Sequence, residues 1–448
     1  MTDITATTNR TTLFWIGAAA LFTSAFSTAV RAAIASDLKV TFLDPIDATI
    51  SATLIAQALG AAFLGFAIML FVTSLILEWI GMRAMLVFAA VGYVAGSLVV
   101  LMCGAFAPGL DPYRLIWIGM FINGVAWGAT EATINPMIAA LYPESRTHRM
   151  NMLHAYWPAG LIVGGLASVA ISWGGFGWRP ALALVPLAAL IFGVIALKSR
   201  FPQTESAQMG LSGRDRLHEV IRRPSFFIWF GLMFLTAASE LAPGQWVDLA
   251  LSKVVGMRGI LLLVYVSALM FVGRHFAGTL TRWLSAEGLL CLSSILAAAG
   301  LFLLSGATSP TSALVAATVW GLGVCYMWPT MIATVAERYP RGGAWTIGLI
   351  GMAGALSIYF ALPVLGSLYD QAAVAAAGGP EALASLSGSR LEAVQAVAAK
   401  QSLGGMAMIP AVLVVFFGLL WLLARQSPTS ALGVSDNRQG NADASETV

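Results

Sequence analysis

Long runs of apolar residues, separated by short polar stretches, make up most of the chain. A helix needs about 20 consecutive apolar residues to cross roughly 30 Å of hydrocarbon, and twelve runs are long enough. A membrane β-barrel would need segments of about ten residues that alternate strictly between apolar and polar. The pattern therefore predicts an all-α membrane protein with twelve transmembrane helices. The runs cover approximately residues 13–35, 52–77, 84–106, 113–141, 154–175, 180–198, 226–250, 259–284, 288–306, 311–336, 345–369 and 405–424.

Composition agrees with this prediction and excludes several classes of protein. Hydrophobic residues make up 58% of the chain and charged residues 10%, against roughly 25% charged in soluble domains. The first run follows Arg10 but is too long for a secretion signal, so we expect it to be retained. All three cysteines fall inside runs, so we expect neither disulfides nor a metal or other cofactor. The formal charge of +3 and the lack of a basic aromatic-rich stretch predict no nucleic-acid partner.

An arginine-rich stretch at residues 199–225 divides the runs into two groups of six. If both termini are cytoplasmic, most Lys and Arg residues of the connections also lie in the cytoplasm, as the positive-inside rule requires. We therefore predict a multi-pass protein of the inner cell membrane. Its expected parts are a cytoplasmic N-terminus at 1–12, helical halves at 13–198 and 226–425, a cytoplasmic linker at 199–225 and a disordered cytoplasmic tail at 426–448. On the outside, residues 371–402 predict an amphipathic surface helix or a partial lid.

The two groups of runs share residues at nearly fixed offsets, which predicts pseudo-symmetric halves of common origin. Three sets of matches occur in the same order along both groups. Trp15 and Gly17 match Trp229 and Gly231, Glu78 and Trp79 match Arg282 and Trp283, and Gly124 and Tyr142 match Gly321 and Tyr339.

Charged residues inside apolar runs are the first indication of function, because a charge at mid-bilayer costs at least ~2.5 kcal/mol and usually faces a cavity. In the first run, Ser24, Ser27, Thr28 and Arg31 recur at spacings of three and four, which places them on one helix face. We predict a polar stripe that faces the protein interior. The alternative is that Arg31 lies near the outer end of the run and extends to the lipid headgroups.

The fourth run combines an aromatic ring, a carboxylate and two amides on one helix face. Asn123, Trp127, Glu131 and Asn135 follow one another at intervals of four. Such a face suits a sugar, whose C–H surface stacks on a ring while its hydroxyls need donors and acceptors. A structural polar network is the alternative.

Other polar and aromatic residues extend the predicted site to both halves. In the seventh run, Pro243 and Gly244 predict an interruption of the helix beside Glu240, where a transporter would expose backbone to its solute. Arg274 could bind the solute or neutralise Glu240, and His154 could bind it or cap a helix end. The further candidates for solute binding are Asn151, His154, Trp157, Gln245, Trp246, Arg274, Tyr326 and Trp328.

The connection between the second and third runs resembles the signature of the major facilitator superfamily. That signature has a glycine, an acid four residues later, and then glycine and basic residues; here Ser74 replaces the first glycine, followed by Glu78, Gly81 and Arg83. The resemblance implies the superfamily's fold of two six-helix halves. It also suggests that Glu78, Arg83 and Arg282 latch the halves on the cytoplasmic side, although charges that merely set the topology would give the same pattern.

Residues from Glu131 to Gly165 resemble the fourth and fifth helices of the fucose permease group of sugar:proton symporters. This resemblance implies sugar import driven by protons. It also implies that Glu131 corresponds to the carboxylate of the group's fourth helix and Asn135 to the neighbouring amide. The sequence departs from the group in the first helix, where Arg31 stands instead of an acid.

The main prediction is therefore a secondary active transporter of a small polar solute, first of all a sugar, with Glu131 and Glu240 as candidates for proton coupling. Arg31 leaves open an organic anion such as a uronate, because guanidinium groups match carboxylates. A drug:proton antiporter would need a larger and more apolar cavity. We expect neither an enzyme, because no nucleophile and base recur on one face, nor a receptor. The expected partners are the solute, protons and the lipid bilayer, with the protein as a monomer.

Overall fold

The computed structural model describes residues 10–104, 109–142, 149, 152–203, 222–252, 254–274, 277–339 and 343–426, and all regular structure in them is helical. The first group of helices comprises α1 (Arg10–Leu38), a π-helical turn (Lys39–Leu43), the short α2 (Asp44–Asp47), α3 (Ser51–Ile80), α4 (Met82–Leu101), α5 (Pro112–Leu141), α7 (Tyr156–Trp173) and α8 (Arg179–Lys198). The second comprises α11 (Ser225–Leu251), α12 (Ile260–Gly273), α13 (Ala277–Ser305), α14 (Pro310–Val324), α15 (Met327–Arg338), α16 (Gly343–Ala377), α17 (Pro380–Ser385) and α18 (Gly388–Gln426).

The lengths and composition of these helices make the chain a multi-pass membrane protein. Within the described residues, ten helical segments are long and apolar enough to cross a bilayer, and α12 is a shorter apolar helix. The 30 residues of α5 are also enough for a span, although the polar residues on this helix lower its hydropathy. These helices correspond one by one to the twelve predicted runs.

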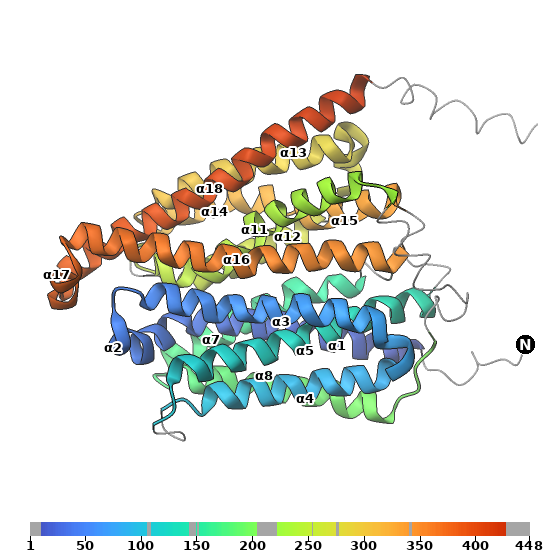
Figure 1. Cartoon of the computed structure of the whole chain (residues 1–448), viewed down its shortest axis with the longest axis horizontal. Coiled ribbons are helices and arrows are strands. Elements are labelled where there is room, and N and C mark those ends of the chain that lie inside the picture. Colours follow the sequence, from blue (N-terminus) through green and yellow to red (C-terminus); the bar gives the residue numbers. More distant parts are fainter. Residues whose placement is uncertain are drawn as a thin grey trace, which may run out of the picture.

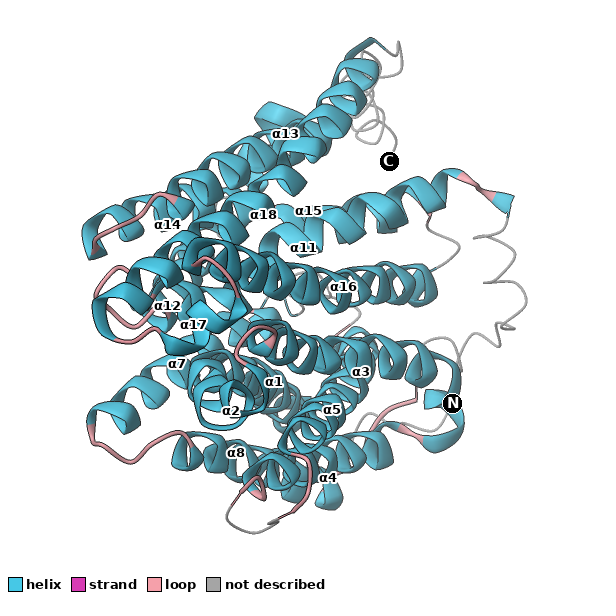
Figure 2. Ribbon diagram, turned by 60° about the vertical axis from the view of Figure 1, so that its left-hand side comes forward, coloured by secondary structure: helices cyan, strands magenta, loops and turns pink. Residues whose placement is uncertain are grey.

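The helices form two groups that lie side by side (Figure 1), with α1 to α8 in one half and α11 to α18 in the other. Figure 2 shows the two halves from another direction, with α16 of the second half next to α3 of the first. We call the side where α1 and α11 begin the terminal side, on the right of Figure 1. The opposite side, where α2 and α17 lie, is the distal side.

Within the first half, α3 and α5 approach each other at backbone distance. A Cβ atom added at Gly124 of α5 would lie 1.8 Å from the carbonyl oxygen of Ala62 on α3. No residue larger than glycine fits there, and small residues at helix interfaces are a general means of close packing in membranes. These two helices therefore form one closely packed pair.

The structure differs from the predicted runs at several element ends. The tenth run is broken at Cys325 and Tyr326 into α14 and α15, and the last helix begins at Gly388 rather than near residue 405. The expected surface segment, 371–402, consists of the end of α16, α17 and the start of α18. In the linker, 204–221 lies outside the described residues, as do 1–9 and 427–448.

The interruption predicted at Pro243 is absent, because α11 continues through this residue. Proline lacks an N–H group, so it cannot donate to the carbonyl four residues earlier. That carbonyl belongs to Ser239, and it accepts a hydrogen bond from the indole of Trp320 on α14 at 3.3 Å. A side chain from another helix thus replaces the missing backbone donor.

Candidate functional site

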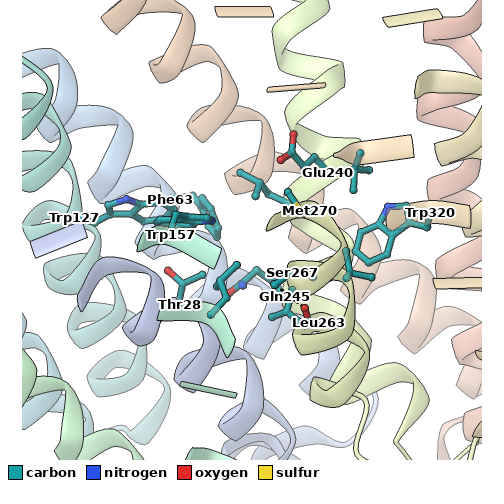
Figure 3. Close-up of a pocket in the computed structure, with 15 residues that line it drawn as sticks. Thr28, Phe63, Trp127, Trp157, Glu240, Gln245, Leu263, Ser267, Met270 and Trp320 are labelled. Carbon is teal, nitrogen blue, oxygen red and sulfur yellow. Dashed lines mark hydrogen bonds between the residues drawn. The ribbon is translucent and has the colours of Figure 1, made fainter. Parts of the chain in front are cut away.

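A central cavity lies between the two halves and contains several of the predicted site residues (Figure 3). Its volume is about 30 Å³, enough for roughly two water molecules. The space is therefore too small for a larger solute, which would enter only after the helices moved apart. The lining comes from both halves: Thr28, Phe63, Trp127, Trp157 and Leu161 from the first, and Glu240, Leu241, Gly244, Gln245, Leu263, Val266, Ser267, Met270, Trp320 and Val324 from the second.

Stacked aromatic rings form the wall on the side of the first half. Trp127 of α5 stacks on Phe66 of α3, with ring centroids 4.0 Å apart and an interplanar angle of 7°. On its other side it stacks on Trp157 of α7, at 5.1 Å and 21°. Both tryptophans border the cavity. Three helices thus contribute to one rigid aromatic wall.

Glu131 lies one helical turn beyond Trp127 on α5. Its Oε1 accepts a hydrogen bond of 2.7 Å from the indole N–H of Trp127. Among the described residues no cation forms an ion pair with it. The charge of this carboxyl is therefore compensated by a single neutral donor, and that donor belongs to the cavity wall.

Glu240 faces the cavity from α11 and is more fully paired than Glu131. Its Oε2 accepts from the backbone N–H of Trp328 at 3.1 Å, in the first turn of α15. Its Oε1 lies 3.5 Å from Nη2 of Arg274, and Nε of Arg274 donates to the carbonyl of Cys325. Glu240 and Arg274 thus both bind groups at the break between α14 and α15.

Gln245 and Trp246 are neighbours on α11 but point in different directions. Gln245 is buried and lines the cavity, and its side-chain oxygen has no hydrogen-bond partner among the described residues. Trp246 instead donates to the hydroxyl of Ser402 on α18 and packs edge-on against Tyr369 of α16. Of these two candidates, Gln245 alone is positioned to contact a solute in the cavity.

Arg31 belongs to a buried polar network behind the cavity wall. Its side chain is 1% exposed, and it donates to the carbonyl of Ser27 and to the hydroxyl of Thr28, which lines the cavity. Tyr93 of α4 donates to Ser24 in the same network. Nη1 of Arg31 has no partner among the described residues. The guanidinium is therefore enclosed by the protein and is not exposed at its surface.

The remaining candidates that the structure describes lie away from the cavity lining. Asn123 is buried and donates to the carbonyl of Gly119 on its own helix. His154 lies 3.1 Å from the side-chain oxygen of Asn135, which joins α5 to the start of the fifth span. The hydroxyl of Tyr326 donates to the carbonyl of Gly273. Asn151 lies outside the described residues.

The predicted latch residues can be placed in part. Arg83 is exposed at the start of α4. The backbones of Glu78 and Arg282 belong to α3 and α13, but their side chains are outside the described part of the structure. The proposed latch therefore stays a prediction.

The sequence did not single out Phe63, Ser267, Met270 and Trp320, which also line the cavity. Phe63 and Met270 are ordinary residues of apolar helices, and only their position in the fold distinguishes them. Trp320 could have been noticed as the donor that a proline in α11 requires, but the sequence does not show which helix supplies that donor.

Comparisons with known proteins agree on the fold. A sequence profile of the Major Facilitator Superfamily matches residues 12–362. No curated protein matches the chain in sequence.

Several solved structures of transporters resemble the chain. A D-xylose-proton symporter has a TM-score of 0.72 and 16% identity, covering 91% of this chain and 96% of its own. A POT family transporter in complex with 5-aminolevulinic acid has a TM-score of 0.66 and 11% identity, covering 92% and 96%. FucP, a major facilitator transporter in the outward conformation, has a TM-score of 0.54 and 16% identity, covering 89% and 98%. At these identities the likeness concerns the fold, and with the profile match it establishes that the chain belongs to the major facilitator superfamily.

Proposed function

We propose that this protein imports a small hydroxylated solute, in the first place a sugar, by proton-coupled symport. The observation that carries the proposal is the cavity between the halves, which has an aromatic wall on one side and, among apolar residues, the polar side chains of Glu240, Gln245 and Ser267 on the other (Figure 3). Trp157 offers a ring face for the C–H surface of a sugar. Gln245 offers an unpaired amide oxygen to a hydroxyl, and leaving such a group unpaired in a buried site costs about 1–3 kcal/mol.

Alternating access fits this arrangement, because the cavity walls come from different halves. A rocking movement of one half against the other would open the cavity to one side of the membrane and then to the other. The D-xylose-proton symporter supports a sugar as solute through its name and its shared fold. The fucose-permease-like stretch around Glu131 supports it through its residues.

An organic anion such as a uronate is the second candidate, and Arg31 favours it. This guanidinium is buried without a carboxylate partner among the described residues, and its Nη1 is free. Burying an unpaired charge is costly, and an anionic solute would provide the missing partner. Arg31 is connected to the cavity through its hydrogen bond to Thr28. An anionic solute would have to break that hydrogen bond or bind beside it.

Glu131 is the better candidate for the proton carrier. Glu240 already binds the first turn of α15 and lies near Arg274, so its charge is balanced within the protein. Glu131 has one neutral donor, Trp127, which is also part of the solute wall. Protonation removes the charge that opposes rocking, and it changes a contact of the wall. Proton and solute would thus act on the same indole.

Two experiments test the proposal. Uptake competition between labelled monosaccharides, uronates and lipophilic cations should identify the solute class; inhibition by lipophilic cations alone would contradict the proposal and favour a drug antiporter. With the solute known, Glu131→Gln should still exchange solute across the membrane but lose accumulation against a gradient. Glu381→Gln, at an exposed acid of α17, is the control. Normal accumulation by Glu131→Gln under an imposed pH gradient would reject Glu131 as the carrier.

A further inference from the structure

On the distal side, a carboxylate of one half caps a helix of the other half. Asp370 of α16 accepts hydrogen bonds from the backbone N–H of Ala52 at 3.2 Å, from that of Thr53 at 2.7 Å and from the hydroxyl of Thr53 at 2.7 Å. Ala52 and Thr53 belong to the first turn of α3. The residue at the N-cap position of α3 is Ile50, whose side chain cannot accept a hydrogen bond.

This contact is favourable for both partners. The first N–H groups of a helix have no partners within it, and a nearby carboxylate satisfies them and interacts well with the helix dipole. One turn earlier on α16, a Cβ at Gly366 would lie 2.6 Å from the carbonyl oxygen of Ala52. The two helices therefore touch at backbone distance, and Asp370 is held directly over the end of α3.

A second polar contact joins the halves on the same side. Arg258, in the connection between α11 and α12, donates to the hydroxyl of Ser172 at 2.7 Å and to the carbonyl of Ala33 at 3.0 Å. Ser172 belongs to α7 and Ala33 to α1, both in the first half. One guanidinium thus connects two helices of the first half to the second.

The connection that carries Arg258 is itself fixed. Asp248 of α11 lies 3.6 Å from Nη2 of Arg258, and its other oxygen accepts from the backbone N–H of Ile260 at 2.7 Å. Ser252 accepts from the N–H of Gly259 at 2.8 Å. The bonds from the N–H groups of Ile260 and Gly259 do not involve Arg258, so the turn keeps them when the contacts of Arg258 across the halves are broken.

The terminal side is joined differently. There Phe71 of α3 meets Trp345 of α16, with ring centroids 5.6 Å apart, and Leu70 lies against Gly348. The hydrogen bonds that Asp370 and Arg258 make to the first half lie on the distal side. Directional polar bonds thus close one side, and ring and aliphatic contacts are seen on the other.

We propose that Asp370 and Arg258 are gating residues, which together close the distal side of the cavity and must release their partners in each transport cycle. The inference rests on the proposed function, because it assumes that the halves alternate. It concerns the opening of the distal side, whatever solute is carried. Both residues belong to the second half, and all their partners across the gate lie at the distal ends of α1, α3 and α7.

Cysteine accessibility tests the gate without any solute. In the full-length chain with Cys103, Cys291 and Cys325 replaced by alanine, Ser267→Cys places a thiol in the cavity lining. A membrane-impermeant thiol reagent added from the distal side should then label Asp370→Asn and Arg258→Gln about tenfold faster than the parent, the shift expected from a loss of ~1.4 kcal/mol. Labelling from the terminal side should slow down.

Two further variants separate gating from simple helix capping. Asp47→Asn removes an acid on the same side whose side chain bonds, among the described residues, to Thr49 of its own half, and it should label like the parent. Ile50→Ser, added to Asp370→Asn, gives α3 a cap from its own sequence. If Asp370 acts as a gate, the double variant should stay rapidly labelled, because the connection between the halves is still missing.

Two outcomes would overturn the proposal: parental labelling of both single variants from the distal side, or restoration of slow labelling by Ile50→Ser. If Asp370→Asn does not assemble in the membrane, Arg258→Gln carries the test with the same reagent. A failure of the sugar proposal would appear in uptake competition and leave the labelling rates unchanged. The two failures can therefore be told apart.

Discussion

Arg31 raises the main question at the scale of single residues, because it is a buried charge without a carboxylate partner in the described structure. Its Nε and Nη2 are bound to Ser27 and Thr28, which fixes the plane of the guanidinium. Nη1 remains free. A fixed, planar donor with one open position suits a carboxylate better than a neutral hydroxyl.

If the solute is an anion, Arg31→Gln should lower its uptake by roughly 10- to 100-fold, since a hydrogen bond to a charged group contributes about 1.5–3 kcal/mol. Arg31→Lys should retain part of the uptake, because the ammonium keeps the charge but loses the planar fork. Initial rates with a uronate and with the matching neutral sugar measure the effect. Equal loss for both solutes would indicate a structural role for Arg31, and unchanged uptake would exclude it from the site.

The sequence could identify residues such as Glu131, Glu240 and Arg31, because a charge inside an apolar run is costly enough to need a reason. It could not tell which neighbour on a helix faces the cavity: Gln245 does so, whereas Trp246 packs against α16 and α18. It also gave no reason to select Asp370 or Arg258. Charges near the ends of spans are common, and their importance comes from partners about 318 and 225 positions away in the sequence.

At the scale of elements, hydrophobic run length predicted every span, including α5 with its polar stripe. Run length does not report how a helix is interrupted. Pro243 leaves α11 continuous because Trp320 supplies the missing donor, whereas the break between α14 and α15 occurs at Cys325 and Tyr326, without a proline at either position. Both outcomes depend on neighbouring helices, which the local sequence does not contain.

The contact of α3 with α5 leads to a prediction at this scale. Gly124→Ala would place a methyl group 1.8 Å from the carbonyl oxygen of Ala62, so the helices must separate, and we expect a destabilisation of at least about 1–3 kcal/mol. Gly231→Ala on α11, where no atom outside the neighbouring backbone lies within 4 Å of the added carbon, should not destabilise the protein and should stabilise it by up to about 1 kcal/mol, because alanine favours a helix over glycine. Thermal unfolding in detergent compares the two. Equal midpoints would show that α3 and α5 are packed less closely than described.

For the whole molecule, the orientation in the membrane is the prediction with the widest consequences. We expect the terminal side, with the linker at 199–225, to face the cytoplasm, and the segment 371–402 to lie outside, because Lys and Arg concentrate on the terminal side. Cysteines introduced at Ser212 and Ser387 should react with an impermeant reagent from the inside and from the outside, respectively. If each cysteine reacts from the other side instead, the protein has the opposite orientation, and the proposed gate faces the cytoplasm.

Because α3 and α16 touch near both ends, the helices can open at one end while the contact at the other end acts as a pivot. The contacts at Thr53 and Phe71 are 71 − 53 = 18 residues apart along α3, or roughly 27 Å at 1.5 Å per residue. A rotation of about 10° around either contact would move the other end by about 5 Å, close to the thickness of a pyranose ring. A modest tilt, with one end acting as the fulcrum, is thus enough to admit a sugar, and neither helix has to bend.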